Sequence, residues 1–237
     1  MLLVLWYTSK AFVPTFVLSG KKIGYFEFVI IGEIFILAPL SAIHCYTKTL
    51  RVLLIEKMFD HFLLLNKPLY FNLFVLHLGP FAIEFMRWII LVVIGYIMVP
   101  DSIPLLQCLS LLAMQLAVLP IFWALGQIAC AFIIRFGRGQ NIITVFMTIS
   151  AILSGVYFPT QVLPVELSSF FDRFSPFNLT LNLSREVLSS GWRNADLMTP
   201  LLSLLLWALV LVPLSICLLN YSVHAYRKQG RCGYLPQ

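Results

Sequence analysis

The stretch that decides the fold is Pro104–Ile134, PLLQCLSLLAMQLAVLPIFWALGQIACAFII, which contains no charged residue. A bilayer core about 30 Å thick needs roughly 20 apolar residues for one helical span. Inside lipid a spanning segment must satisfy its own backbone hydrogen bonds, which leaves helices and closed barrels. The stretch is too long and too continuous for the roughly ten-residue alternating strands of a barrel. It therefore predicts a transmembrane helix.

The composition extends this prediction to the whole chain. Of the 237 residues, 60% are hydrophobic and only 11% are charged, and the mean hydropathy is +0.93. A soluble domain usually carries about 25% charged residues. We therefore expect an all-α polytopic membrane protein with a single domain, residues 1–237. The predicted spans cover about residues 2–18, 23–46, 70–99, 104–134, 141–158 and 200–221.

Two of these six spans are interrupted. The first is short and contains Lys10 and Pro14, and the third holds a Gly79-Pro80 break. The start of the chain has no basic n-region and no small-residue cleavage site, so it is not a signal peptide. Because Met1 begins inside a hydrophobic segment, we interpret the start as a truncated first helix.

The orientation follows from Lys and Arg in the short loops, which are enriched on the cytoplasmic side. One set of loops holds nine of these residues: Lys48, Arg51, Lys57, Lys67, Arg135, Arg138, Arg227, Lys228 and Arg231. The opposite set holds six: Lys10, Lys21, Lys22, Arg173, Arg185 and Arg193. This bias favours a cytoplasmic C-terminus. The net charge of +6 suits a basic excess beside anionic lipid and does not call for nucleic acid.

Signatures of enzymes and metal sites are missing from the sequence. The chain has no GxSxG, HExxH or GxxxxGK[ST] motif, so it does not bind ATP through a P-loop. The five cysteines form no CxxC pair, and most lie in or beside predicted spans, which favours packing residues over zinc ligands or disulfides. We expect no catalytic residue, no metal and no cofactor bound by this chain.

The segment Lys48–Pro68 is predicted to be an amphipathic helix at the membrane surface. Its charged face would carry Glu56, Lys57, Asp60 and His61, and its apolar face would carry Ile55, Met58, Phe59 and Phe62. Such a helix is either a surface anchor or a docking helix for a cytoplasmic partner. A metal site at His61 is a weaker interpretation than a solvated helix face.

Three ionisable residues lie at membrane depth. Glu33 is in the middle of the second span, and Glu84 and Arg87 are three residues apart in the third. A charge near the bilayer centre costs about 2.5–3.5 kcal/mol on insertion scales, so such residues usually face protein or water. Glu84 and Arg87 can form a structural ion pair on one helix face. Glu33 is a candidate for a polar path or an interhelical hydrogen bond.

The segment Ser154–Gly191 is hydrophobic but broken by three prolines, at 159, 164 and 176. It is too irregular for a span and too apolar for a free loop. We expect a pair of short helices that dip back into the outer leaflet after the fifth span. Irregular backbone at that depth requires cover by protein or water.

This elbow resembles the signature of the ABC-2 type transporter permeases, an SGxxFP–LP–xPxx–R–LLxG pattern after the fifth span. The matching residues are Ser154, Gly155, Phe158, Pro159, Pro164, Pro176 and Arg185. Further similarity lies in Gly32-Glu33, Phe59-Asp60, Lys67-Pro68 and the run from Gly126 to Arg138. The resemblance covers about residues 20–230. The amphipathic helix that precedes the first span in that family is not contained in this sequence.

The resemblance implies the transmembrane subunit of an ABC exporter in a bacterial or archaeal cytoplasmic (inner) membrane. Two such subunits, identical or different, would form a pathway, and separate P-loop ATPase subunits that bind ATP and Mg²⁺ would drive it. Lys48–Pro68 would be the ATPase-coupling helix and Ser154–Gly191 the family's re-entrant elbow. The cargo would be a lipid, a lipid-linked polysaccharide, a drug or a peptide.

Two other classes of function stay open at this point. One is an ion-coupled secondary transporter or channel that uses Glu33 and the Glu84/Arg87 pair. Such transporters often contain inverted repeats. The other is an accessory or assembly subunit with no transport of its own.

Overall fold

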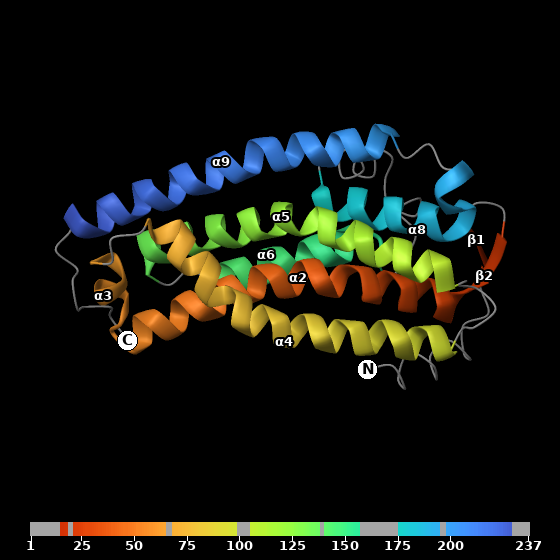
Figure 1. Cartoon of the computed structure of the whole chain (residues 1–237), viewed down its shortest axis with the longest axis horizontal. Helices are drawn as coiled ribbons and strands as arrows, with labels where there is room; N and C mark the ends of the chain where they lie inside the picture. Colours follow the sequence, from red (N-terminus) through yellow and green to blue (C-terminus); the bar gives the residue numbers. More distant parts are fainter. Residues whose placement is uncertain are drawn as a thin grey trace. The chain divides into compact units, whose positions relative to one another are not determined.

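Most of the described chain is α-helical. The computed structural model describes residues 15–18, 21–64, 68–98, 105–137, 140–156, 175–194 and 198–228. Figure 1 labels the helices along the chain. They are α2 (Tyr25–Ile55), α3 (Phe59–Leu63), α4 (Leu69–Met98), α5 (Leu105–Phe136), α6 (Gln140–Leu153), α8 (Pro176–Asn194) and α9 (Met198–Lys228).

Four of these helices are long and apolar enough to cross a membrane, as the sequence predicts for its second, third, fourth and sixth spans. The candidate spans are Phe28–Ile55, Leu69–Ile97, Leu112–Phe136 and Met198–Lys228. At 1.5 Å per residue each exceeds the roughly 30 Å of the hydrocarbon core. The chain is therefore an integral membrane protein.

The other two predicted spans are not found as predicted. Helix α6 has 14 residues and ends at Leu153, so it is only about 21 Å long and shorter than the predicted span 141–158. Residues 15–18 of the predicted span 2–18 form a β-strand, and residues 1–14 lie outside the described part of the chain.

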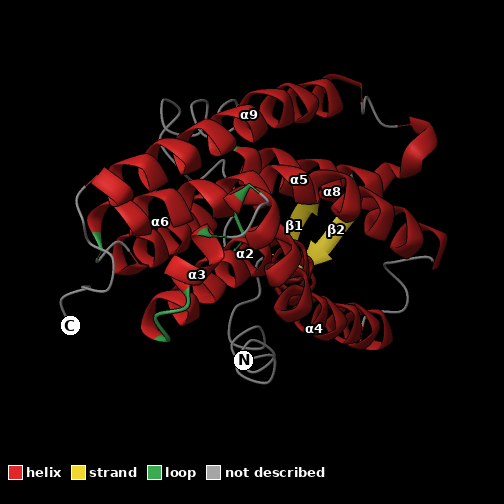
Figure 2. Cartoon of the chain, turned by 60° about the vertical axis from the view of Figure 1, so that its left-hand side comes forward, coloured by secondary structure: helices red, strands yellow, loops and turns green. Residues whose placement is uncertain are grey.

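A short hairpin is the one departure from an all-α fold among the described residues. Strand β1 (Thr15–Leu18) pairs antiparallel with β2 (Lys21–Gly24), and Leu18 is opposite Lys21 (Figure 2). Successive side chains of a β-strand point to opposite faces. Hydropathy averaged over a window does not register this alternation, so an apolar hairpin strand looks like the start of a helix. The predicted second span consequently begins as a helix at Tyr25, not at residue 23.

The chain divides into two compact units. Unit 1 is formed by Met1–Ala38, Arg87–Val118 and Thr148–Leu204, and unit 2 by Pro39–Met86, Leu119–Met147 and Leu205–Gln237. Each long helix therefore contributes one part to each unit. In α2 the division falls at Pro39, and in α5 it falls one residue before Pro120. In α4 and α9 the division falls after Met86 and after Leu204, away from Pro80 and Pro213.

The prolines do not end the helices that contain them. Helix α4 runs through Gly79-Pro80 without interruption, so the break predicted there is wrong. Transmembrane helices tolerate proline because neighbouring groups satisfy the freed carbonyl.

Unit 2 has an aromatic core. Tyr46, Leu50, Phe59, Leu73 and Leu219 are among its fully or almost fully buried side chains. Two helices approach closely at Gly126, where an added Cβ would lie 2.8 Å from the Tyr46 ring. A glycine at this position lets α5 approach the α2 tyrosine. A larger residue would force the tyrosine ring to shift.

Unit 1 is held by side chains that bond to helix carbonyls. Trp88 Nε1 donates to Ile34 O over 2.6 Å, and Gln115 Nε2 donates to Phe35 O over 3.0 Å. Each bond joins another helix to α2. Phe35 lies four residues before Pro39, which has no N–H to donate back to it, so Gln115 supplies a partner for a carbonyl that the proline leaves free. A buried donor without a partner costs about 1–3 kcal/mol, so these bonds fix which faces of the helices meet.

Helix α2 ends at Ile55, inside the segment predicted to be a separate amphipathic helix. Lys57 has a left-handed backbone with φ of 57°, and its N–H donates to Leu54 O. The next N–H, of Met58, donates to Leu53 O over 3.0 Å. This pair of bonds is the Schellman arrangement that closes many helices. The predicted single helix Lys48–Pro68 is therefore wrong: its first eight residues extend α2, and only Phe59–Leu63 form a new helix, α3.

We expect Lys57→Gly to raise the stability of the protein. A residue with a Cβ costs roughly 1–2 kcal/mol in the left-handed region, and glycine avoids most of that cost. The gain should be about 1 kcal/mol, read as a higher unfolding midpoint in detergent micelles. Lys57→Val is the matched variant, and its midpoint should fall. If Lys57→Val were the more stable of the two, this helix end would not have the backbone described above.

Candidate functional site

The elbow residues Gly155 and Arg185 are brought together in unit 1, although 30 positions separate them in the sequence. Arg185 lies on α8 and donates from Nη2 to Gly155 O over 2.8 Å. Gly155 is in a turn directly after α6 with φ of 82°, a conformation that favours glycine. Ser154 precedes it, and its hydroxyl donates to Ala151 O, so the turn is tied back to the helix before it.

The Arg185 guanidinium is buried against an aromatic ring. Its side chain is 8% exposed, and Cζ lies 4.0 Å from the centroid of the Phe28 ring. Burial lowers the pKa of Arg185 to about 10, which leaves the group charged at neutral pH. A desolvated cation over an aromatic face gains about 2 kcal/mol, which partly offsets the cost of burial.

Gly32 completes this contact from α2. A Cβ added at Gly32 would lie 2.8 Å from the carbonyl oxygen of Val156. The backbone of α2 therefore touches the turn that contains Gly155. We call the cluster of Phe28, Gly32, Ser154, Gly155 and Arg185 the elbow contact.

The remaining elbow residues are only partly covered by the structure. Pro176 is the first residue of α8, where its missing N–H costs nothing. Phe158, Pro159 and Pro164 lie outside the described residues. Helix α8 is not among the candidate spans; it begins inside the predicted elbow segment and runs three residues beyond it, to Asn194.

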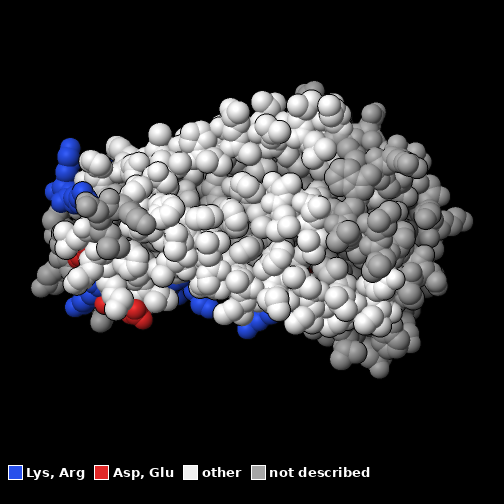
Figure 3. All heavy atoms as spheres, in the orientation of Figure 1, with Lys and Arg blue, Asp and Glu red and all other residues white. Residues whose placement is uncertain are grey.

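The candidate coupling residues lie around α3 at one end of unit 2. Figure 1 places α3 beside the C-terminal end of α9, and Figure 3 shows charged atoms gathered there. Phe59 is buried and meets the Tyr226 ring edge-on, with 5.3 Å between centroids. Arg227 Nη2 donates to Leu63 O over 3.1 Å. Helix α3 is too short to be stable alone, so these contacts with α9 hold it in place.

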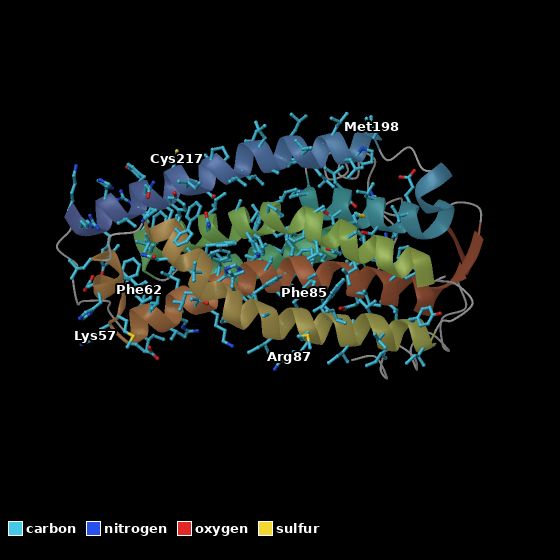
Figure 4. The ribbon with its side chains drawn as sticks, viewed as in Figure 1. Lys57, Phe62, Phe85, Arg87, Met198 and Cys217 are labelled. Carbon is cyan, nitrogen blue, oxygen red and sulfur yellow. The ribbon has the colours of Figure 1, made fainter. Side chains whose placement is uncertain are left out.

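The four charged residues do not share one helical face as predicted. Glu56 and Lys57 belong to the turn before α3, and both are exposed. Figure 4 shows Lys57 at the outer edge of this end. Asp60 is half-buried and accepts a hydrogen bond from the Tyr226 hydroxyl at 3.5 Å, while His61 is exposed. The positive φ at Lys57 breaks the 3.6-residue period on which the predicted face depended.

The residues at membrane depth are distributed over two helices. Glu33 on α2 is half-buried, as is Glu84 on α4, and Arg87 is exposed. In Figure 4 Arg87 points away from the α4 ribbon. All three residues take part in polar or electrostatic interactions. Among the described residues, no three His, Cys, Asp or Glu side chains are placed to hold a metal ion.

A buried polar network in unit 2 was missed by the sequence analysis. Gln127 Nε2 donates to the Tyr46 hydroxyl over 3.2 Å, and the Ser215 hydroxyl donates to Gln127 Oε1 over 3.0 Å. The network joins α2, α5 and α9 inside the apolar core. A single Gln or Ser in a hydrophobic segment gives no sign of its partner, but uncharged polar residues within a span are the signal that could have been followed.

His77 lies beside this network. Its ring stacks on Tyr46 with 3.8 Å between centroids, and its Nδ1 bonds to Phe74 O at 2.9 Å. The side chain is fully buried, and its Nε2 has no hydrogen-bond partner among the described residues. Since only one ring nitrogen is satisfied, His77 acts mainly as an aromatic packing residue here.

Comparison with known proteins gives no family: no family model, no curated protein and no solved structure matches this chain.

We expect Arg185→Leu to destabilise the protein by about 1–3 kcal/mol, because it leaves Gly155 O with one partner fewer and removes the cation from Phe28. Arg185→Lys should retain only part of the stability lost in Arg185→Leu, because a lysine cannot reproduce the planar guanidinium. The measurement is the unfolding midpoint in detergent. Asn182→Leu, an exposed position on the same helix, is the matched control and should change the midpoint little. Equal midpoints for the Arg185 and Asn182 variants would show that the elbow contact contributes no stability.

We expect Gln127→Leu to lower stability by about 1–3 kcal/mol, because it leaves the buried Tyr46 hydroxyl without the Gln127 bond, whereas the Ser215 hydroxyl keeps Val212 O as an acceptor. His77→Phe keeps the ring on Tyr46. It removes the local Nδ1 bond to Phe74 O and an Nε2 that has no partner among the described residues, so its loss of stability should be smaller. Both midpoints are measured in the same detergent. A larger loss for His77→Phe would mean that the histidine, not the glutamine, carries the polar interaction of this core.

Proposed function

We propose that this chain is the membrane-spanning permease subunit of an ATP-driven ABC exporter of the ABC-2 type. The observation that supports this best is the elbow contact. Gly155 and Arg185 lie at distant positions of the elbow pattern, Gly32 belongs to a separate piece of the resemblance, and in the folded chain the three meet. A chance similarity spread over α2, the turn after α6 and α8 has no reason to converge on one contact.

The proposed cargo is a lipid, a lipid-linked polysaccharide, a drug or a peptide, moved out of the cytoplasm of a bacterial or archaeal cell. Energy comes from a separate P-loop ATPase, which binds ATP and Mg²⁺. A second permease copy or homologue completes the pathway. The C-terminus and α3 face the cytoplasm in this proposal, because the loops on that side carry more Lys and Arg.

The proposed contact for the ATPase is the α3 end of unit 2. A partner that does mechanical work must push on a part that transmits force to the spans. Phe59 is buried in the core, Asp60 bonds to Tyr226, and the carbonyl of Leu63 is held by Arg227. Force applied to α3 therefore reaches α9 directly. Glu56, Lys57 and His61 remain exposed and are free to meet a protein surface.

We expect the double change Glu56→Lys with Lys57→Glu to weaken ATPase association while the chain still inserts into the membrane. The pair keeps the net charge and leaves the Asp60–Tyr226 bond intact. Tagged chain is purified from native host membranes, and P-loop ATPase recovered with it is measured by ATP hydrolysis and mass spectrometry. Recovery should fall several-fold relative to the unaltered chain.

Two controls accompany this experiment. Asn182→Lys places a new charge at an exposed position on α8 and should leave ATPase recovery unchanged. The unfolding midpoint of the double variant should match that of the unaltered chain. If no ATPase is recovered with the unaltered chain, or if that chain alone transports in vesicles along an ion gradient, the ABC proposal fails and the ion-coupled class replaces it.

A further inference from the structure

Unit 2 contains a cavity of about 230 Å³ whose walls come from α4, α5 and α9. An engineered apolar protein cavity of about 150 Å³ is large enough to bind benzene. The cavity in unit 2 therefore has room for a ring or for several methylene groups. The cavity is open on one side, so its occupant can enter from the surroundings of the unit.

The wall of the cavity is almost entirely apolar. Phe71 and Phe74 line it from α4, Trp123 from α5, and Val212 from α9. The polar lining groups are few: Gln127 and Ser215 are bonded to each other, Tyr70 contributes a hydroxyl, and the indole N–H of Trp123 has no hydrogen-bond partner among the described residues. The rest of the wall is hydrocarbon, and it favours an apolar occupant over a cluster of water molecules, which would need two to four polar partners each.

The position of the cavity indicates where that occupant comes from. Phe71 and Val212 line the cavity and are also 41% and 37% exposed, so the cavity reaches the outer surface of the unit. That surface belongs to candidate membrane spans, where the surrounding solvent is lipid. Tyr70 is the second residue of its span, and Val212 lies near the middle of α9. The cavity thus extends from the end of one span toward mid-membrane.

We propose that this cavity binds one acyl chain of a membrane phospholipid, with the headgroup at the Tyr70 end and the chain running past Trp123 toward Val212. An acyl chain matches the apolar wall, the direction of the cavity and its opening toward the bilayer. Tyrosine near the end of a span suits the level of the headgroups, because its ring is apolar and its hydroxyl is polar. The proposal does not depend on the exporter function, because it rests only on this cavity and on the membrane location.

The test is photolabelling of the full chain in vesicles of phosphatidylcholine that carries a diazirine near the middle of one acyl chain. After irradiation the labelled residues are mapped by peptide mass spectrometry. We expect labels on Phe74 and Trp123, which line the cavity, as well as on lipid-facing residues of α9 such as Leu205 and Leu209. Absence of label on Phe74 and Trp123 overturns the proposal.

Two filling variants make the test specific. Val212→Phe narrows the cavity from its exposed side, and Ile216→Phe fills it from the same helix. Each should reduce labelling of Trp123 several-fold and leave Leu209 labelled as before. Leu214→Phe introduces the same ring at an exposed α9 position outside the cavity. It should change neither the labelling of Trp123 nor that of Leu209. The two filling variants provide independent readings if one of them folds poorly.

Two further results would also overturn the proposal. One is undiminished Trp123 labelling in a folded filling variant, which would mean that lipid touches the indole only at the protein surface. The other is labelling by a free diazirine fatty acid but not by the phospholipid, which would mean that the cavity admits a detached chain and not a bilayer lipid.

Discussion

The fold rests on the requirement that every backbone N–H and C=O inside a membrane find a partner within the protein. Water is absent there, and an unpaired group costs several kcal/mol. This explains why the apolar stretches form helices long enough to cross a bilayer, and why α4 continues through Pro80 instead of ending. The same requirement governs the few places where the backbone is irregular. At Lys57 the last carbonyls of α2 are closed by a pair of backbone bonds, and at Gly155 the carbonyl accepts from a buried arginine.

Polar side chains within the spans follow the same requirement and determine which helix faces meet. Lipid tails are as apolar as leucine, so burial alone gives the helices little reason to associate. Hydrogen bonds such as Trp88 to Ile34 O in unit 1, and Gln127 to Tyr46 in unit 2, supply a specific orientation. Small residues add to this where a helix backbone meets a large side chain, as at Gly126 against the Tyr46 ring. A small number of hydrogen bonds and close contacts in an apolar surrounding thus holds the helices of each unit together.

Two regions of the chain are held by specific contacts, and the first of them is also exposed. At the α3 end of unit 2, Phe59 and Asp60 are held by Tyr226, while Glu56 and Lys57 remain outside. In unit 1, Arg185 is buried on Phe28 and holds the turn after α6. A transporter of the proposed kind needs both properties, because a partner must find an exposed surface and the force must reach the spans. The lipid-facing cavity in unit 2 adds a third surface, one that the bilayer itself can occupy.

The sequence by itself determined that this is a helical membrane protein, because the length and continuity of segments such as 104–134 depend only on local composition. It also singled out Gly155 and Arg185, which the structure brings together. It could not determine that α2 extends to Ile55, since a helix end depends on the backbone of one residue, Lys57, that hydropathy does not register. Nor could it find the bonds of Gln127 with Tyr46 and Ser215, because those partners are 81 and 88 positions away. Only the tertiary structure decided these contacts, since they arise from helix faces that meet in space and leave no periodic pattern along the chain.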